Sequence, residues 1–167
     1  MPSAFEQVGH LIHMNLRDEL LPYKYVIGQV ILDKNPSCKT VVNKVGKIEA
    51  VFRTFEMELL AGEDNTVVSL KEENCIFKFD YRLVYWNSRL QHEHARLVQS
   101  FSEEDIVADM FCGIGPFVLP AAKKGCTVYG NDLNPNCYKF LNENLKLNKV
   151  ELYSVVNTVD SEERVYV

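Results

Sequence analysis

The chain has 167 residues, enough for one domain or one and a half, and its 47% hydrophobic and 25% charged content is typical of a globular protein. No apolar run approaches the roughly 18–20 residues of a membrane span, and the first six residues show no signal-peptide pattern. Five cysteines without CxxC spacing argue against both a disulfide framework and a metal site. We therefore expect a protein of a reducing compartment, without a membrane partner.

In the first half of the chain, the pattern predicts a small α/β unit. We expect a strand, a helix and an antiparallel sheet, at residues 5–16, 18–32 and 40–86 respectively. The helix has Asp18 and Glu19 in its first turn, and Asn35-Pro36 follows its end. Arg53 interrupts the apolar alternation inside an expected strand, so its spacing alone predicts only an exposed or edge arginine.

In the second half, strands alternate with helices. We expect helices at 91–101, 117–125 and 134–148, and strands at 106–108, 126–131 and 152–156. Ile106-Val107-Ala108 has the continuous apolar character of a buried parallel strand. Pro135 suits the first turn of the last helix.

A glycine loop between the first of these strands and its helix predicts a nucleotide cofactor. Gly113 and Gly115 let the backbone approach a ligand closely, and Asp132 stands at the end of the next strand, where ribose hydroxyls are bound. Val118 stands where a dinucleotide fingerprint has its third glycine, and Asp109 adds a negative charge that favours a cationic group over a pyrophosphate. The pattern therefore predicts S-adenosylmethionine rather than NAD.

Charge is distributed unevenly along the chain. The net charge is −5, but five lysines and one acid between Lys24 and Lys47 give that segment a balance of +4. Lys39 and Lys44 are candidates for contacts with RNA phosphates. A solvated face explains the same spacing equally well.

Seven motifs follow one another in the order Asn15–Asp18, Gly28–Val30, Asp33–Pro36, Leu60–Glu63, Val84–Leu90, Asp109–Phe117 and Asn131–Pro135. Together they resemble one family over about residues 5–150, the archaeal and eukaryotic tRNA (guanine-N1)-methyltransferases, which modify the guanosine at position 37. It implies a monomer that binds the anticodon stem-loop of tRNA. It also implies a cytoplasmic location, with the mitochondrial matrix or the nucleus as further possibilities.

The same resemblance implies an α/β fold in two parts. Residues 1–90 would form a small α/β accessory domain. Residues 91–167 would form the first half of a Rossmann-like class I methyltransferase domain that binds S-adenosylmethionine.

The resemblance also assigns roles to individual side chains. Arg53 would stabilise charge on the guanine O6, Glu93 would take the N1 proton, and Tyr85 would lie near the target base. Arg89 would belong to the substrate-binding motif. The implied cofactor residues are Asp109, Phe111, Gly113, Gly115, Asp132 and Leu133.

Members of this family also carry a further N-terminal domain and a later Asn-Pro type motif that positions the base. We find neither in these 167 residues. We therefore expect a shortened chain that is inactive alone, with the strand at 152–156 left as an unpaired edge. Two alternatives stay open, a non-catalytic tRNA-binding fragment and a related transferase of wybutosine synthesis that uses the same cofactor.

Overall fold

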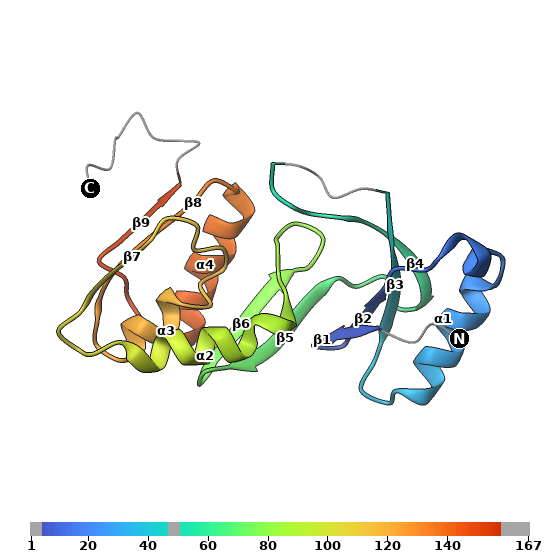
Figure 1. Ribbon diagram of the computed structural model, residues 1–167, viewed down its shortest axis with the longest axis horizontal. Helices are drawn as coiled ribbons and strands as arrows, with labels where there is room; N and C mark the ends of the chain where they lie inside the picture. Colours follow the sequence, from blue (N-terminus) through green and yellow to red (C-terminus); the bar gives the residue numbers. More distant parts are fainter. Residues whose placement is uncertain (1–4, 47–50, 158–167) are drawn as a thin grey trace.

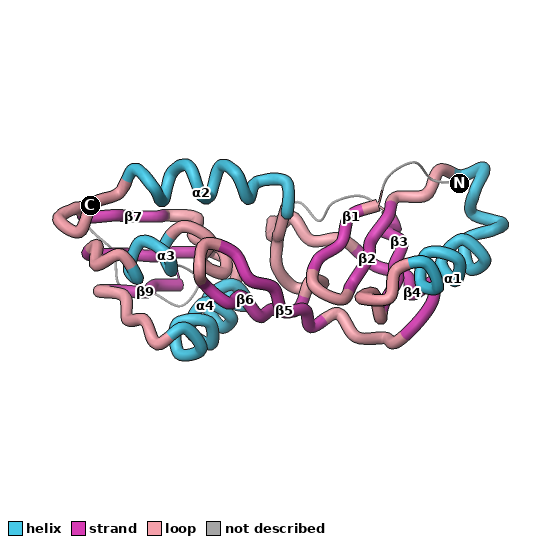
Figure 2. Tube along the Cα trace, turned by 90° about the horizontal axis from the view of Figure 1, so that it is seen from below, coloured by secondary structure: helices cyan, strands magenta, loops and turns pink. Residues whose placement is uncertain are grey.

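The computed structural model describes residues 5–46 and 51–157, and these residues form two lobes along the long axis of the molecule (Figure 1). The first lobe holds β1–β4 and α1, and the second holds α2–α4 and β7–β9. The hairpin β5–β6 lies between them (Figure 2). The α/β class expected from the sequence is confirmed.

The first lobe is a four-stranded sheet with one helix against it. Its elements are β1 (Glu6–Val8), β2 (Leu11–Met14), the 3₁₀ helix η1 (Asp18–Tyr23), α1 (Lys24–Lys34), β3 (Thr40–Val45) and β4 (Glu56–Gly62). The strand order is β1-β2-β3-β4, and only the β2–β3 pair is parallel. The helix α1 makes this parallel crossover and buries Ile27 and Ile31 in a core with Leu60.

Three expectations for this lobe were wrong in detail. Residues 5–16 form a hairpin, not one strand, because Gly9 adopts a positive φ of 58° and reverses the chain. The expected single antiparallel sheet over residues 40–86 is divided between two sheets, and β3 has a parallel neighbour. Arg53 lies before β4 with a φ of 57°, so it is in a loop and not inside a strand.

The hairpin of β5 (Val67–Glu72) and β6 (Cys75–Asp80) packs mainly against the second lobe. Glu73 and Asn74 both have positive φ at its two-residue turn, as a tight hairpin requires. Asn144 accepts a hydrogen bond from the Lys78 backbone N–H at 2.8 Å, and Asn148 bonds both backbone groups of Ile76 at 2.7 Å. These side-chain bonds join the exposed edge of β6 to helix α4.

The second lobe is a parallel three-stranded sheet. Its elements are η2 (Ser88–Leu90), α2 (Gln91–Ser100), β7 (Ile106–Asp109), α3 (Val118–Lys123), β8 (Thr127–Asp132), α4 (Pro135–Asn148) and β9 (Ser154–Asn157). The strand order is β7-β8-β9, with both pairs parallel. Every expected helix and strand of this half is confirmed to within about two residues at each end. Among the described residues, no helix has the length and apolar character needed to cross a bilayer.

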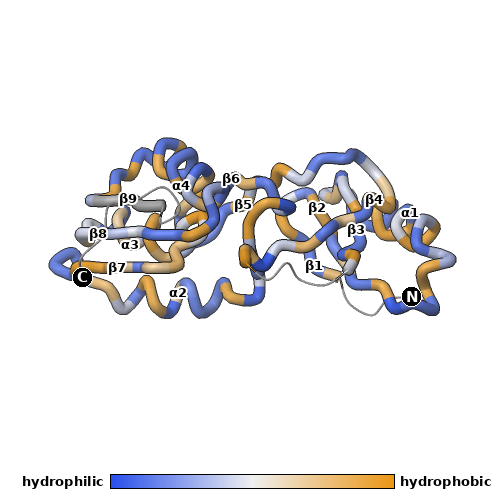
Figure 3. Tube along the Cα trace, turned by 90° about the horizontal axis from the view of Figure 1, so that it is seen from above, coloured by the Kyte–Doolittle hydropathy of each residue, from blue (hydrophilic) through white to orange (hydrophobic). Residues whose placement is uncertain are grey.

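Within the described residues, β7 and β9 are the outer strands of this sheet, so β9 is an edge as expected and β7 is a second one. The side chain of Ile106 on β7 is 73% exposed, unusually high for an apolar residue on a strand. Figure 3, which colours the chain by hydropathy, shows β7 as a run of hydrophobic residues. The edge of β7 is therefore an uncovered apolar surface.

Candidate cofactor and catalytic site

The glycine loop leaves the carboxyl end of β7 and is held against β8 by backbone bonds. The Cys112 N–H donates to the Asn131 carbonyl at 2.9 Å, and the Asn131 side chain donates to the Met110 carbonyl at 3.1 Å. The Gly115 N–H donates to the Cys112 carbonyl at 2.9 Å and closes the turn. The loop is thereby preorganised at the end of the sheet where open α/β folds bind ligands.

The two loop glycines serve different purposes. A Cβ added to Gly115, whose φ is 101°, would overlap Leu119 Cδ1 and lie 2.7 Å from Leu141 Cδ1. A Cβ added to Gly113, whose φ is 54°, would meet no heavy atom within 4 Å. Gly115 is therefore needed for packing, whereas Gly113 borders open space that a ligand can enter.

This difference predicts unequal effects of two alanine substitutions. We expect Gly113→Ala to lower the free energy of unfolding by about 1–2 kcal/mol, the backbone cost of a left-handed alanine. Gly115→Ala should add about 1–3 kcal/mol of overpacking to a similar backbone cost. Urea denaturation of the two variants measures the difference, and equal losses would show that Leu119 and Leu141 yield without strain.

Two carboxylates face each other across this loop. Asp132 accepts hydrogen bonds from the backbone N–H groups of Gly113 and Asn134, both at 2.8 Å, and Asp109 accepts one from Phe111 at 3.1 Å. Burial raises the pKa of the Asp109 carboxyl, and the negative charge of Asp132 raises it further. Bringing a cationic group to this site relieves that repulsion, whereas a pyrophosphate would increase it.

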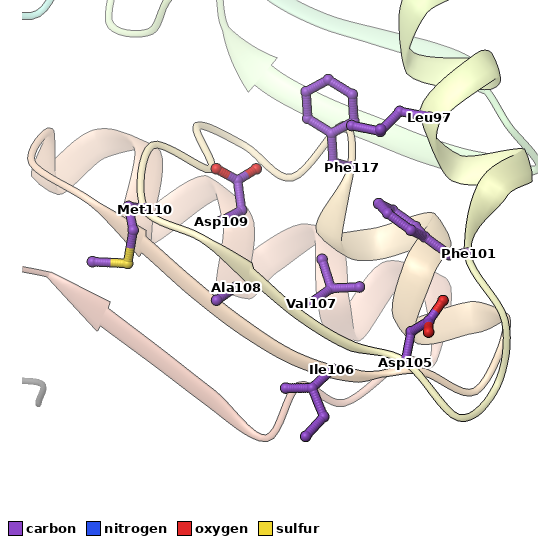
Figure 4. A pocket seen from close by; sticks show the side chains of 9 residues that line it. All are labelled: Leu97, Phe101, Asp105, Ile106, Val107, Ala108, Asp109, Met110 and Phe117. Atoms are coloured by element: carbon purple, nitrogen blue, oxygen red, sulfur yellow. The ribbon is translucent and has the colours of Figure 1, made fainter. Parts of the chain in front are cut away.

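Two apolar residues implied to bind the cofactor flank the loop and are open to a ligand. Phe111 is 88% exposed and Leu133 is 46% exposed. A pocket of about 710 Å³ lies nearby, lined by Asp109, Phe117 and the length of β7 (Figure 4). Its described lining does not include Gly113 or Asp132, so it follows the strand edge and is not the cofactor cavity itself.

The residues with implied catalytic roles form two groups in the described structure. Arg53 and Tyr85 are together, with the guanidinium carbon 5.5 Å from the ring centroid. Glu93, in the first turn of α2, instead binds Arg96 through two hydrogen bonds of 2.6 and 2.8 Å. These bonds hold the pKa of the Glu93 carboxyl below its usual value.

The candidate substrate-binding residues are also separated. Arg89 forms an ion pair with Glu6, across the junction of the two lobes. Lys44 is half-buried on β3, whereas Lys39 is exposed just before the start of that strand. Lys24, from the same lysine-rich segment, is paired with Glu58 at 2.5 Å. Lys24, Lys39 and Lys44 therefore do not form one continuous cationic face, and Lys47 lies outside the residues that the structure describes.

Sequence reasoning missed a buried acid–histidine pair beside the loop. Glu72 Oε1 lies 2.5 Å from His94 Nδ1, and both side chains are 5% exposed. The His94 ring also contacts Trp86 and the edge of Phe117, so it links β5 and α2 to the start of α3. These two polar residues stand 22 positions apart and show no local pattern that could have revealed the pair.

The described cysteines are all buried and free. Burial raises the pKa of the Cys112 and Cys137 thiols well above the usual value, so neither is a thiolate near neutral pH. No cluster of three or more metal-ligating side chains occurs in the ranges that the structure describes.

Comparison with known proteins assigns this architecture. A profile of the TRM5/TYW2 methyltransferase domain matches residues 66–166. The chain belongs to the TRM5/TYW2 methyltransferase family. A profile of the TYW2 N-terminal domain matches residues 1–66 of the same chain. The two matches meet at residue 66, before the hairpin β5–β6, whereas the boundary expected from the sequence is at residue 90. The domain boundary stays a prediction.

Individual members of the TRM5/TYW2 family agree with this assignment. The tRNA (guanine(37)-N(1))-methyltransferase of Dictyostelium discoideum is 57% identical over 96% of the chain. The Trm5b structure from Pyrococcus abyssi superposes on 97% of the chain with a TM-score of 0.86 and 35% identity, and that match covers 49% of the archaeal chain. A complex of aTrm5 with tRNALeu superposes on 93% of the chain and 46% of its own, with a TM-score of 0.84 and 33% identity.

The chain spans about a third of the length of the curated relatives that it matches. The resemblance to the tRNA (guanine-N1)-methyltransferases, which the seven motifs indicated, is confirmed, and so is the Rossmann-like character of the second lobe. The roles of single residues are not addressed by these comparisons.

Proposed function

We propose that this chain contributes the cofactor loop and the base-activating residues of a tRNA (guanine-N1)-methyltransferase that acts on guanosine 37. The observation that carries the proposal is the loop itself. Gly113 opens onto free space, and Asp132 and Asp109 place two carboxylates where a cationic nucleoside fits. The 57% identity to a relative with that activity supports the same reading.

The residues present fit S-adenosylmethionine. Asp132 has lone pairs left for ribose hydroxyls, and the acidic loop favours a sulfonium and an ammonium group. Exposed Phe111 and Leu133 offer apolar surface to a purine ring. When bound, the cofactor supplies an electrophilic methyl group.

The side chains of the protein would then activate the guanine. N1 of guanine carries a proton and is a poor nucleophile near neutral pH. Glu93 would accept that proton as a general base, and Arg53 would stabilise the negative charge that develops on O6. Tyr85, which already contacts Arg53, would hold the base against the guanidinium.

Partner and location follow from the same proposal. The anticodon stem-loop of tRNA is the expected substrate, with Arg89, Lys39 and Lys44 among its contacts, and the protein is expected to act as a monomer. Its expected location is the cytoplasm, with the mitochondrial matrix or the nucleus as further sites. Size-exclusion chromatography with light scattering tests the monomer.

The function is tested by methyl transfer to unmodified tRNA transcripts that carry guanosine or adenosine at position 37. We use a longer chain that contains these 167 residues, because the relatives are about three times this length. We expect N1-methylguanosine only in the guanosine transcript. Equal methylation of both transcripts, or of neither, would contradict the proposal.

Cofactor choice gives a separate prediction for Asp132. We expect S-adenosylmethionine to bind in preference to NAD, and Asp132→Ala to weaken binding by about 1–3 kcal/mol, the cost of losing hydrogen bonds to a charged group. Isothermal calorimetry measures both ligands. Glu104→Ala, which removes an exposed acid outside the loop, is the control. Tight binding of NAD would overturn the choice of cofactor.

A second candidate is favoured by one observation, the match of residues 1–66 to the TYW2 N-terminal domain. A TYW2-like enzyme would move an aminocarboxypropyl group from the same cofactor to tRNA. Mass spectrometry of the modified nucleoside separates the two transfers, because the groups differ in mass. A chain that binds tRNA and modifies nothing would instead be a non-catalytic binding module.

A further inference from the structure

A second pocket, lined in part by charged side chains, lies where the first lobe meets η2, apart from the glycine loop. It has a volume of about 330 Å³ and is lined by side chains from β1, β2, β3, the loop before β4 and η2. The lining residues used below are Glu6, His13, Lys44, Phe55 and Arg89. They come from distant parts of the sequence, so the pocket exists only in the folded chain.

Lys44 is a cation held in this pocket without a direct acidic partner. Its ammonium lies 4.2 Å from the centroid of Phe55 and 5.7 Å from that of Tyr81. Burial lowers the pKa of Lys44, and Arg89 lowers it further, while Glu6 opposes them. Among the described residues, no carboxylate lies within ion-pair distance of this ammonium, unlike that of Lys24. An anion entering the pocket would therefore gain an attraction that the protein itself does not satisfy.

One carboxylate already occupies the opposite side of the pocket. Glu6 forms an ion pair with Arg89 and lies 3.6 Å from His13 Nε2. Burial is the main reason that the pKa of His13 falls to about 4, so its ring is neutral near pH 7. The charged groups lining the pocket are therefore Lys44, Arg89 and Glu6, with a balance of +1. Arginine binds carboxylates and phosphates through the same planar arrangement of N–H donors. The Glu6 carboxylate therefore occupies the position at Arg89 that a phosphate group could take.

The pocket adjoins the group with proposed roles toward the target base. Arg89 stands four residues after Tyr85 in the chain, and Tyr85 contacts Arg53. Glu6 and Tyr85 both act electrostatically on Tyr81, whose ring also faces Lys44. An RNA strand that presents a base at Arg53 and Tyr85 would bring its own backbone close to this pocket.

Resting on the proposed function, we propose that this pocket binds one backbone phosphate of the RNA beside the target nucleotide. Lys44 and Arg89 are its ligands, and Glu6 is the carboxylate that the phosphate displaces from Arg89. The exchange favours a phosphodiester in a particular position over any exposed stretch of backbone, because entry must break the Glu6–Arg89 pair. The site therefore contributes to register as well as to affinity.

The test measures the salt dependence of binding to unmodified tRNA in a longer chain that contains these residues. Lys44→Ala should weaken binding about 5- to 10-fold at low salt and reduce the slope of log K against log salt by about one. Glu6→Gln should have the opposite sign and strengthen binding about 3- to 10-fold, because it frees Arg89 and removes the competing charge. Methyl transfer at saturating tRNA is followed in parallel, and Lys44→Ala should raise KM more than it lowers kcat.

Matched controls separate the pocket from general charge effects. Lys71→Ala removes an exposed lysine on β5, and Glu63→Gln an exposed acid after β4, and both should leave the slope near that of the unaltered chain. Tighter binding by Glu63→Gln equal to that of Glu6→Gln would overturn the displacement. An unchanged slope in Lys44→Ala, with methylation intact, would overturn the site while leaving the proposed function standing.

Two further outcomes distinguish the site from its alternatives. If the longer chain binds tRNA with a Lys44-dependent slope but transfers no methyl group, the proposed function fails and the phosphate site stands. If calorimetry with inorganic phosphate shows Lys44-dependent binding while the RNA slope is unaltered, the pocket takes a small anion and the RNA assignment is wrong. Absence of any RNA binding by the longer chain would also contradict the assignment of this pocket to an RNA phosphate.

Discussion

The isolated 167-residue chain is expected to transfer no methyl group to tRNA above background, although Arg53, Glu93 and Asp132 are all present. The reason is the open edge of its parallel sheet. Ile106 is 73% exposed, and the groove of about 710 Å³ beside β7 is lined by Leu97, Phe101 and other apolar side chains (Figure 4). Asp109 lies at the end of this uncovered strand, so water reaches the site where the charges should act in a dry environment.

A longer chain that covers the edge of β7 should recover the activity. It should also raise the midpoint of thermal unfolding, because covering an apolar strand edge removes both unpaired backbone groups and exposed side chains from water. The measurement is incorporation of labelled methyl groups by both chains at equal concentration. Transfer by the purified 167-residue chain, free of any longer enzyme, would contradict the prediction.

Within the longer chain, Glu93→Gln is expected to lower kcat about 10²- to 10⁴-fold, the usual contribution of a general base. Binding of tRNA should change little, because glutamine keeps the shape of the side chain. The substitution removes only the negatively charged carboxylate that would accept the proton. Single-turnover rates at saturating tRNA, compared with equilibrium binding, measure the two effects separately. A loss confined to binding would assign Glu93 to substrate contact and not to proton transfer.

Arg96→Ala should shift the pH dependence of kcat in a predicted direction. The two hydrogen bonds from Arg96 hold the pKa of Glu93 low, so their loss should let that pKa rise toward its usual value. A base with a higher pKa becomes protonated earlier as pH falls. The acid limb of the kcat profile should therefore move to higher pH in Arg96→Ala, and an unmoved limb would contradict the assignment of Glu93 as the base.

The sequence by itself determined the second lobe well. Alternating apolar strands and amphipathic helices, with Pro135 at a helix start and Gly125 at a helix end, act through local backbone preferences that do not depend on distant contacts. The glycine loop was predicted for the same reason. Gly113 and Gly115 both adopt the positive φ that only glycine takes easily. Asp132 stands at the end of the second strand and accepts a hydrogen bond from the Gly113 N–H, whereas its role toward ribose hydroxyls stays a prediction.

The first lobe was predicted less well, because its connections depend on pairing across the chain. Gly9 turns residues 5–16 into a hairpin, and α1 carries β2 to a parallel neighbour, choices that alternation alone does not distinguish. Arg53 adopts a left-handed conformation in a loop beside Tyr85, 32 positions later in the sequence. Its surroundings could be assigned only when both segments were in place.

Two long-range side-chain pairs were decided by tertiary structure alone. Glu72 and His94 are buried together, and Glu6 reaches Arg89 across 83 positions, with no periodic signal to connect them. The lysine-rich segment was visible as composition, but only the fold shows that Lys44 is half-buried against Phe55 while Lys39 is exposed. The sequence determines which charges the chain carries. Burial and long-range packing decide which of them remain unsatisfied and so are available to a ligand.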